Sequence, residues 1–222
     1  MNIGIIGLGY VGLTLGVVAC LKKFRVYGVE RSELIIQSLK QKKAHFYEPG
    51  LDALIASQID KSFFVDSAFD PKRTIDTFII TVGTPLMDNK APNFGHIKSA
   101  LEKLRDVYTG EQLVILRSTI SVGTTKKVVL PFLSELCGKP QDEILVAFCP
   151  ERTIEGKAVR ELQELPQIIG ANNKRSLILA ENFFREITPT IIKVDSLEAA
   201  ELIKLFNNTY RDIHFALGNV FN

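Results

Sequence analysis

The residues best suited to hold a ligand form a glycine-rich loop near the N-terminus. Gly7, Gly9 and Gly12 make up a GxGxxG motif, which follows a strand-like apolar run at residues 2–6 and opens a helical pattern. In this context the first glycine permits a tight turn, and the second lets backbone N–H groups approach a pyrophosphate. The third lets the helix pack closely on the strand. The motif therefore predicts that a dinucleotide binds at a helix N-terminus.

An acidic residue completes the predicted cofactor site. Glu30 closes the second strand-like run, where a carboxylate accepts hydrogen bonds from the adenosine ribose. A carboxylate there repels a 2′-phosphate, so the sequence favours NAD over NADP. The neighbouring Arg31 is positively charged and reduces that preference. Tyr10 and Val11, inside the glycine motif, belong to the same predicted cofactor-binding set. The alternative interpretation is a structural turn beside a solvated glutamate.

The pattern along the chain predicts the scaffold that positions these residues. The 222 residues are 46% hydrophobic and 23% charged, which is ordinary for a globular protein with a sizeable core. Short runs rich in Ile and Val alternate with segments of helical periodicity, which predicts an α/β fold with a doubly wound, parallel, Rossmann-like sheet. The strand-like runs are 2–6, 25–29, 63–66, 77–82, 112–117, 144–148, 167–169 and 191–194. The helical segments are 11–21, 34–39, 97–107, 125–136 and 176–184.

The end of the chain has a different pattern. Residues 1–195 are expected to form the NAD-binding domain, and residues 196–222 to begin a long connecting helix in which helix formers dominate early. Asp195 with Glu198 is close to a capping box, which indicates where this helix begins. Because it extends further than the domain needs, we expect the helix to contact something else.

Charge and composition exclude several classes of protein. The formal net charge is +2 and the basic residues are scattered, so nothing indicates nucleic-acid binding. No apolar run reaches the length of a transmembrane helix, and the N-terminus lacks the pattern of a signal peptide. The three cysteines and three histidines show no ligand spacing, so neither a disulfide framework nor a metal site is expected. These features predict a cytoplasmic protein.

Seven motifs extend this interpretation along the whole chain. They are GLGYVGL (7–13), YEPGL (47–51), VGTP (82–85), RSTISVGTT (117–125), CPERTIEGKAVREL (149–162), PQIIGA (166–171) and EAAELIKLFNNTYRDIHFALGN (198–219). In this order they resemble the UDP-glucose/GDP-mannose dehydrogenase family. The resemblance implies NAD-dependent oxidation of the C6 hydroxymethyl group of a UDP-sugar to a uronic acid, with two hydride transfers. The PER and NTYRD patterns resemble the branch that oxidises UDP-N-acetylhexosamines, and UDP-glucose is the other candidate substrate.

The resemblance also implies roles for individual residues. Thr84 and Thr119 would line the nicotinamide side of the cofactor, and Glu151 would lie beside substrate and cofactor. Glu155, together with Thr119, would handle the water that hydrolyses a thioester intermediate. The catalytic set is Thr119, Glu151, Glu155, Lys204 and Asn208, and the substrate-binding set is Glu151, Arg152, Lys204, Asn208 and Arg211.

Lys204 and Asn208 match the family's pair that stabilises the oxyanion at C6. They are four residues apart, so they lie on one helix face, one turn apart. An ammonium and an amide N–H₂ group placed in this way are two donors for one developing negative oxygen. The alternative is a solvated lysine paired with Glu201 or Glu198, which is common on helix surfaces.

The family's cysteine nucleophile and UDP-binding domain lie beyond the region that this chain matches. Cys20 and Cys137 fall in helical segments and Cys149 only precedes the PER motif, so none is expected to replace the nucleophile. We expect this polypeptide alone to bind NAD without completing the reaction, its partner being the C-terminal part of the same protein. The family's long helix also forms a dimer core, so a homodimer through Leu205, Phe206 and Phe215 is expected.

Two other functions are compatible with parts of this pattern. A Rossmann dehydrogenase of the 6-phosphogluconate or hydroxyacid type also uses a lysine and an asparagine on a helix after the nucleotide domain. The PER block and YEPGL favour the nucleotide-sugar family over that class. A non-catalytic NAD-binding module that senses cofactor or regulates a partner is the second alternative.

Overall fold

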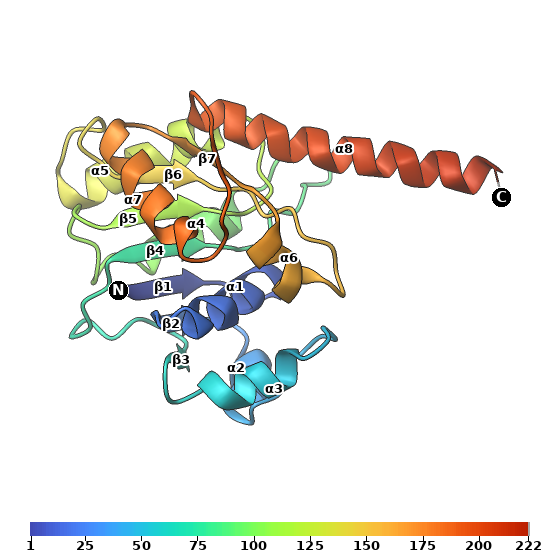
Figure 1. The fold of residues 1–222 in the computed structure, drawn as a ribbon. Coiled ribbons are helices and arrows are strands. Elements are labelled where there is room, and N and C mark those ends of the chain that lie inside the picture. The colour runs from blue at the N-terminus through green and yellow to red at the C-terminus, as the bar shows by residue number, and fades with distance from the viewer. Residues whose placement is uncertain (222) are drawn as a thin grey trace.

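Eight strands form one sheet at the centre of the protein, whose computed structural model describes residues 1–221 (Figure 1). Their order is β3-β2-β1-β4-β5-β6-β7-β8, and the first six follow the 3-2-1-4-5-6 order of doubly wound dinucleotide-binding folds. Every neighbouring pair is parallel except β6 and β7. The strands are β1 (Asn2–Ile6), β2 (Arg25–Val29), β3 (Phe63–Asp66), β4 (Thr77–Ile80), β5 (Leu113–Leu116), β6 (Val146–Phe148), β7 (Gln167–Ala171) and β8 (Ile191–Lys193).

Helices cover both faces of the sheet, which explains why its strands are continuous apolar runs. In β4, Ile79 belongs to the core on one face, and Phe78 and Ile80 belong to the core on the other. The Ile79 face packs against α1 (Tyr10–Leu21), α3 (Leu51–Gln58), α6 (Ala158–Glu164) and α7 (Lys174–Arg185). The opposite face packs against α4 (Gly95–Glu102), η1 (Thr125–Val129) and α5 (Leu130–Cys137), while α2 (Glu33–Lys40) lies beside β3. The predicted doubly wound, mostly parallel α/β fold is confirmed.

The structure differs from the sequence prediction in several places. β7 runs antiparallel to β6. The residues between them, 149–166, contain only the seven-residue helix α6, so the chain enters β7 at the same edge of the sheet at which it leaves β6. The short helices α3 and α6 are absent from the predicted set, since about two turns give too little periodicity to recognise. The helix expected at 125–136 begins as the π-helical turn η1 and continues as α5.

The long helix expected at the end of the chain is α8 (Leu197–Phe221). Ser196, rather than Asp195, caps it, because the Ser196 hydroxyl accepts a hydrogen bond from the Ala199 N–H at 3.0 Å. The start of α8 packs against β7 so closely that a Cβ at Gly170 would lie 2.3 Å from the Ser196 carbonyl oxygen. Further along, the helix extends away from the sheet into solvent (Figure 1).

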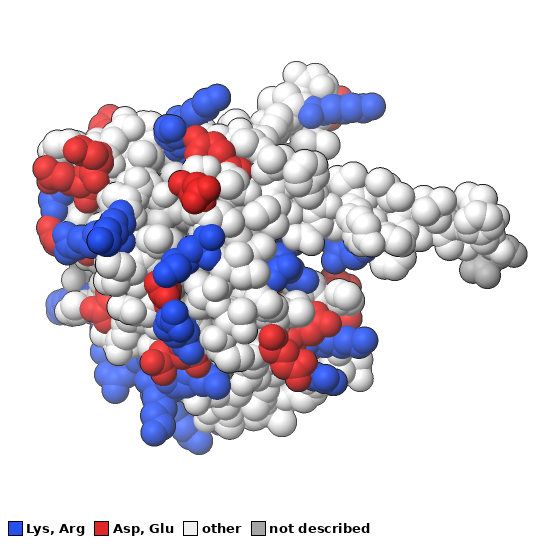
Figure 2. Space-filling model, turned by 45° about the horizontal axis from the view of Figure 1, so that its top comes forward, with Lys and Arg blue, Asp and Glu red and all other residues white. Residues whose placement is uncertain are grey.

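The surface carries charges of both signs. Figure 2 shows lysine and arginine interspersed with aspartate and glutamate over the face it presents, in keeping with the net charge of +2. The projecting part of α8 shows few charged side chains in this view. Within residues 1–221, no helix combines the length and apolar character needed to cross a membrane.

Candidate cofactor and substrate site

The glycine loop leaves the carboxyl end of β1, where the strand order reverses between β1 and β4. Gly7 has a φ of +89°, a conformation that favours glycine. A Cβ at Gly12 would lie 2.0 Å from the Gly7 carbonyl oxygen and 2.5 Å from Thr81 Oγ1, so only glycine fits there. Gly9 has nothing within 4 Å of a Cβ built on it. The loop therefore provides the tight turn, the close helix contact and the open approach that a pyrophosphate requires.

Glu30 lies beside this loop at the end of β2 and is only 8% exposed. Its Oε2 accepts a hydrogen bond from the Leu8 N–H at 2.7 Å, and its Oε1 accepts one from the Arg31 N–H at 2.9 Å. The Arg31 residue itself is exposed. The carboxylate is thus held at the glycine loop, where the hydroxyls of an adenosine ribose would reach it.

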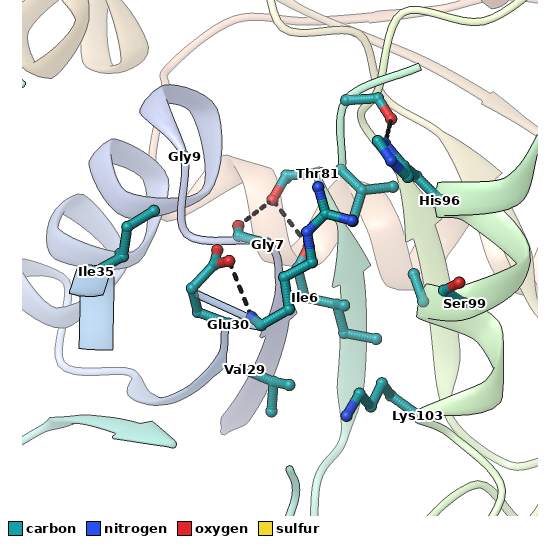
Figure 3. A pocket seen from close by; sticks show the side chains of 14 residues that line it. Ile6, Gly7, Gly9, Val29, Glu30, Ile35, Thr81, His96, Ser99 and Lys103 are labelled. Carbon is teal, nitrogen blue, oxygen red and sulfur yellow. Dashed lines mark hydrogen bonds between the residues drawn. The ribbon is translucent and has the colours of Figure 1, made fainter. Parts of the chain in front are cut away.

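A pocket of about 230 Å³ lies between the glycine loop, Glu30 and α4 (Figure 3). One wall of the pocket was not predicted from the sequence: it is formed by His96 and Ser99 of α4 and by Lys103, which directly follows that helix. Their three- and four-residue spacing places them on one helix face, a signal that could have found them. The His96 Nδ1–H donates to the Gly83 carbonyl at 2.9 Å, and this bond fixes the ring against the loop after β4.

Two threonines predicted for the nicotinamide side meet at the ends of β4 and β5. The Thr84 hydroxyl donates a hydrogen bond to the Thr119 backbone carbonyl. Ser118 donates from its hydroxyl to the Val82 carbonyl at 2.6 Å, so the same two loops are joined twice. The structure therefore brings Thr84 and Thr119 together, and their contact with the cofactor stays a prediction.

Tyr10 and Val11 lie in the first turn of α1, next to the glycine loop but outside the lining of the pocket. The Tyr10 hydroxyl donates to Glu48 Oε2 at 2.8 Å. Glu48 belongs to the YEPGL motif, one of those that carry the family resemblance, and the sequence alone predicts no role for it. Direct contact of Tyr10 and Val11 with a cofactor stays a prediction.

A buried arginine anchors the loop that follows β6 and carries the PER motif. Arg117 is 3% exposed, and its Nη1 donates to the Cys149 carbonyl at 3.0 Å and to Gln167 Oε1 at 2.8 Å. Its guanidinium also lies 5.3 Å from the centroid of the Phe184 ring. These contacts fix the start of the loop that carries Glu151.

Lys204 reaches from α8 to Glu151, and both residues are buried. The Lys204 ammonium donates to the Glu151 backbone carbonyl and lies 3.8 Å from Glu151 Oε2. Burial lowers the pKa of Lys204. The Glu151 carboxylate opposes this shift, and the charges of Arg117, Arg211 and Arg152 add to it. Lys204 is thus a desolvated cation at the carboxyl edge of the sheet.

The other predicted substrate residues surround this pair. Asn208 lies one turn along α8 from Lys204, and its Oδ1 accepts a hydrogen bond from Arg211 Nη2 at 3.3 Å. Arg152 donates to a backbone carbonyl just before β7, and Glu155 is exposed in the loop between β6 and α6. The roles of these side chains toward a substrate stay predictions.

A buried glutamate on α8, Glu201, holds a loop, which the sequence did not predict. Its side chain accepts hydrogen bonds from the Gly123 N–H, from the Thr125 N–H at 2.9 Å, and from the Thr125 hydroxyl. Glu198 pairs instead with an exposed lysine of η1 at 3.3 Å. Neither glutamate pairs with Lys204, which removes the alternative of a solvated surface pair.

The three cysteines of the described chain are free thiols, and Cys20 and Cys149 are buried. Cys149 is fully buried, and burial raises the pKa of its thiol. Burial also raises the pKa of Cys20 to about 11. Because the thiolate is the nucleophilic form, neither is suited to attack an aldehyde at neutral pH.

A doubly wound sheet with a glycine loop and an acidic residue at its switch point defines a dinucleotide-binding domain. The family model described as "UDP-glucose/GDP-mannose dehydrogenase family, NAD binding domain" matches residues 1–188. The chain therefore belongs to the UDP-glucose/GDP-mannose dehydrogenase family and contains its NAD-binding domain, as the motifs predict.

Known proteins of this family are similar over the whole chain. UDP-N-acetyl-D-mannosamine dehydrogenase from Campylobacter jejuni is 32% identical over 224 residues, which cover 97% of this chain and 54% of that protein. The structure of UDP-D-ManNAc dehydrogenase from Pyrococcus horikoshii matches with a TM-score of 0.90 and 30% identity, over 100% of this chain and 53% of the other. The structure of GDP-mannose dehydrogenase from Pseudomonas aeruginosa, solved as a ternary complex, matches with a TM-score of 0.89 and 28% identity. The match covers 99% of this chain and 52% of the other. The chain thus spans about half the length of these relatives.

Proposed function

We propose that this chain is the cofactor half of an NAD-dependent dehydrogenase that oxidises the C6 hydroxymethyl group of a UDP-N-acetylhexosamine to the uronic acid. The observation that carries the proposal is the buried Lys204 ammonium held on Glu151, beside the loops of an NAD-binding domain. The relatives named as UDP-N-acetyl-D-mannosamine dehydrogenases support the N-acetylhexosamine as substrate, and UDP-glucose is the second candidate.

The proposed roles follow from the chemistry of the oxidation. NAD, when bound, accepts a hydride, and converting an alcohol to a carboxylate requires two hydride transfers, one water and two NAD. The glycine loop and Glu30 would bind the dinucleotide, with Thr84 and Thr119 toward its nicotinamide. Lys204 and Asn208 would stabilise negative charge on the C6 oxygen.

The remaining residues would act on the substrate and on water. Glu151 would hold Lys204 in place beside the substrate, and Glu155 would direct a water in the hydrolytic step. Arg152 and Arg211 would contact the sugar or its diphosphate. Family membership favours this activity over a hydroxyacid dehydrogenase, and the pairing of Lys204 with Glu151 favours it over a module that only binds NAD.

Hydride transfer by an enzyme that contains this half tests the proposal. A chimera of residues 1–222 with the second half of the Campylobacter jejuni relative should form two NADH per UDP-N-acetylmannosamine, followed by absorbance. Lys204→Met should slow this reaction roughly a hundredfold or more, whereas Lys126→Met, at an exposed position, should leave it unchanged. A folded chimera that binds NAD but forms no NADH with any UDP-sugar would contradict the proposal. The 222-residue chain alone is expected to form none.

We further propose that the protein is a cytoplasmic homodimer, with residues 1–195 as one domain and 196–222 as the start of a dimerisation helix. Phe206 and Phe215 are 64% and 65% exposed on α8, and Leu205 is partly buried beside them. Burying such rings in a second copy would stabilise association. Light scattering should therefore show a dimer that Phe206→Ser weakens, and a monomer at high concentration would contradict it.

A further inference from the structure

The YEPGL motif contains a buried carboxylate that the proposed reaction does not use. Glu48 is 6% exposed and lies between α2 and α3, far in sequence from the residues it binds. Its Oε2 accepts two hydrogen bonds, one from the Tyr10 hydroxyl at 2.8 Å and one from the Gly156 N–H at 2.8 Å. One carboxylate oxygen therefore joins the first turn of α1 to the loop between β6 and α6.

Tyr10 makes a second contact with the same loop. Its hydroxyl lies 3.2 Å from the Ile154 carbonyl oxygen. Burial raises the pKa of the phenol, and the neighbouring Glu48 raises it further. The Ile154 carbonyl belongs to the peptide group before Glu155, and the Gly156 N–H belongs to the peptide group after it. Both peptide groups that flank Glu155 are thus bound by the Glu48–Tyr10 pair, while the Glu155 residue remains exposed.

The other end of this pair reaches the cofactor site. Tyr10 directly follows Gly9 and is the first residue of α1, whose N-terminus faces the predicted pyrophosphate. The first turn of α1 and the Glu155 loop lie more than a hundred residues apart in the sequence. A ligand that orders the first turn of α1 would therefore act on the Glu155 loop through Tyr10 and Glu48.

We propose that Glu48 is a positioning residue: with Tyr10 it forms a clasp that fixes the backbone on both sides of Glu155 and couples that loop to the cofactor helix. The inference rests on the proposed function for the role of Glu155. The clasp itself rests on the two hydrogen bonds that Glu48 accepts and on the single Tyr10 hydroxyl proton, which is shared between Glu48 and the Ile154 carbonyl. YEPGL is then a functional motif whose glutamate acts through backbone geometry and does not touch the substrate.

Amide hydrogen exchange of the 222-residue chain, followed residue by residue, tests the clasp without cofactor. Glu48→Ala should speed exchange of the Gly156 amide at least tenfold, and Glu48→Gln, which keeps one acceptor oxygen, should give an intermediate rate. Core amides such as that of Ile79 should not change. Tyr47→Phe is the matched control, because Tyr47 is 85% exposed and adjacent to Glu48. Unchanged exchange at Gly156 in Glu48→Ala would overturn the clasp.

The same experiment with saturating NAD tests the coupling. In the wild-type chain NAD should slow exchange at residues 154–157 further, and in Glu48→Ala it should not. If calorimetry shows NAD bound while the wild-type loop does not respond, the clasp has only a structural role and the coupling is wrong. Absence of NAD binding would instead contradict the proposed function, so the two failures are distinguishable.

Discussion

Replacing Glu201 should destabilise the domain far more than replacing its neighbour Glu198 one turn earlier on α8. Glu201 is fully buried and accepts hydrogen bonds from two backbone N–H groups, those of Gly123 and Thr125. Glu201→Ala leaves both buried donors without a partner. Each such loss costs about 1–3 kcal/mol, so the free energy of unfolding should fall by about 2–6 kcal/mol.

Glu198→Ala is the control. Glu198 forms a single ion pair at 3.3 Å, with its side chain 34% exposed and that of Lys126 64% exposed. Exposed pairs of this kind are worth up to about 1 kcal/mol. Urea unfolding followed by circular dichroism gives both free energies, and thermal scans should place the Glu201→Ala midpoint at least about 4 °C below that of the wild type. If the free energies of unfolding of Glu201→Ala and Glu198→Ala differ by less than about 1 kcal/mol, the anchoring of loop 123–125 by Glu201 is refuted.

Two further predictions concern the glycine loop and Lys204. Gly12→Ala should lower the thermal midpoint strongly, because its Cβ would lie 2.0 Å from the Gly7 carbonyl oxygen, whereas Gly9→Ala should fold normally but bind NAD at least about tenfold more weakly. A wild-type midpoint for Gly12→Ala in a thermal scan would contradict this. Because burial lowers the pKa of Lys204 below 10.5, the unfolded chain holds more protons between the lowered pKa and 10.5. The stability of wild type relative to Lys204→Met, measured by urea unfolding, should therefore rise with pH through that window, and a flat or falling difference would refute the shift.

Most of the fold could be predicted because its central strands are buried on both faces. Runs such as residues 78–80 and 113–116 are apolar throughout, and their alternation with helical periodicity leaves few topologies. The direction of β7 could not be predicted, since it depends on whether residues 149–166 cross the sheet, and no local pattern encodes that. The cap of α8 is Ser196 and not the predicted Asp195 for a similar reason. Neighbouring polar residues can each cap a helix, and the backbone geometry decides which of them does so.

The site could be predicted where sequence neighbours act together, and it was missed where distant residues meet. The residues of the glycine loop are contiguous, and Glu30 follows them at the sequence spacing that is typical of dinucleotide-binding folds, so both are recognisable. Glu48 and Glu201 act on backbone N–H groups of loops far along the chain, and nothing in their own segments points to those partners. Lys204 is ambiguous by spacing alone, because helix surfaces often carry such lysines; its burial against Glu151 distinguishes it.

Calorimetric titration of the chain with NAD and, separately, with NADP tests the central claim most directly. Glu30 is held beside the glycine loop, where its carboxylate would accept the ribose hydroxyls and repel a 2′-phosphate. We predict micromolar to sub-millimolar binding of NAD, with NADP at least tenfold weaker, a difference of about 1.4 kcal/mol. Equal or tighter binding of NADP would mean that Arg31 overrides Glu30, and binding of neither dinucleotide would contradict the assignment of the site.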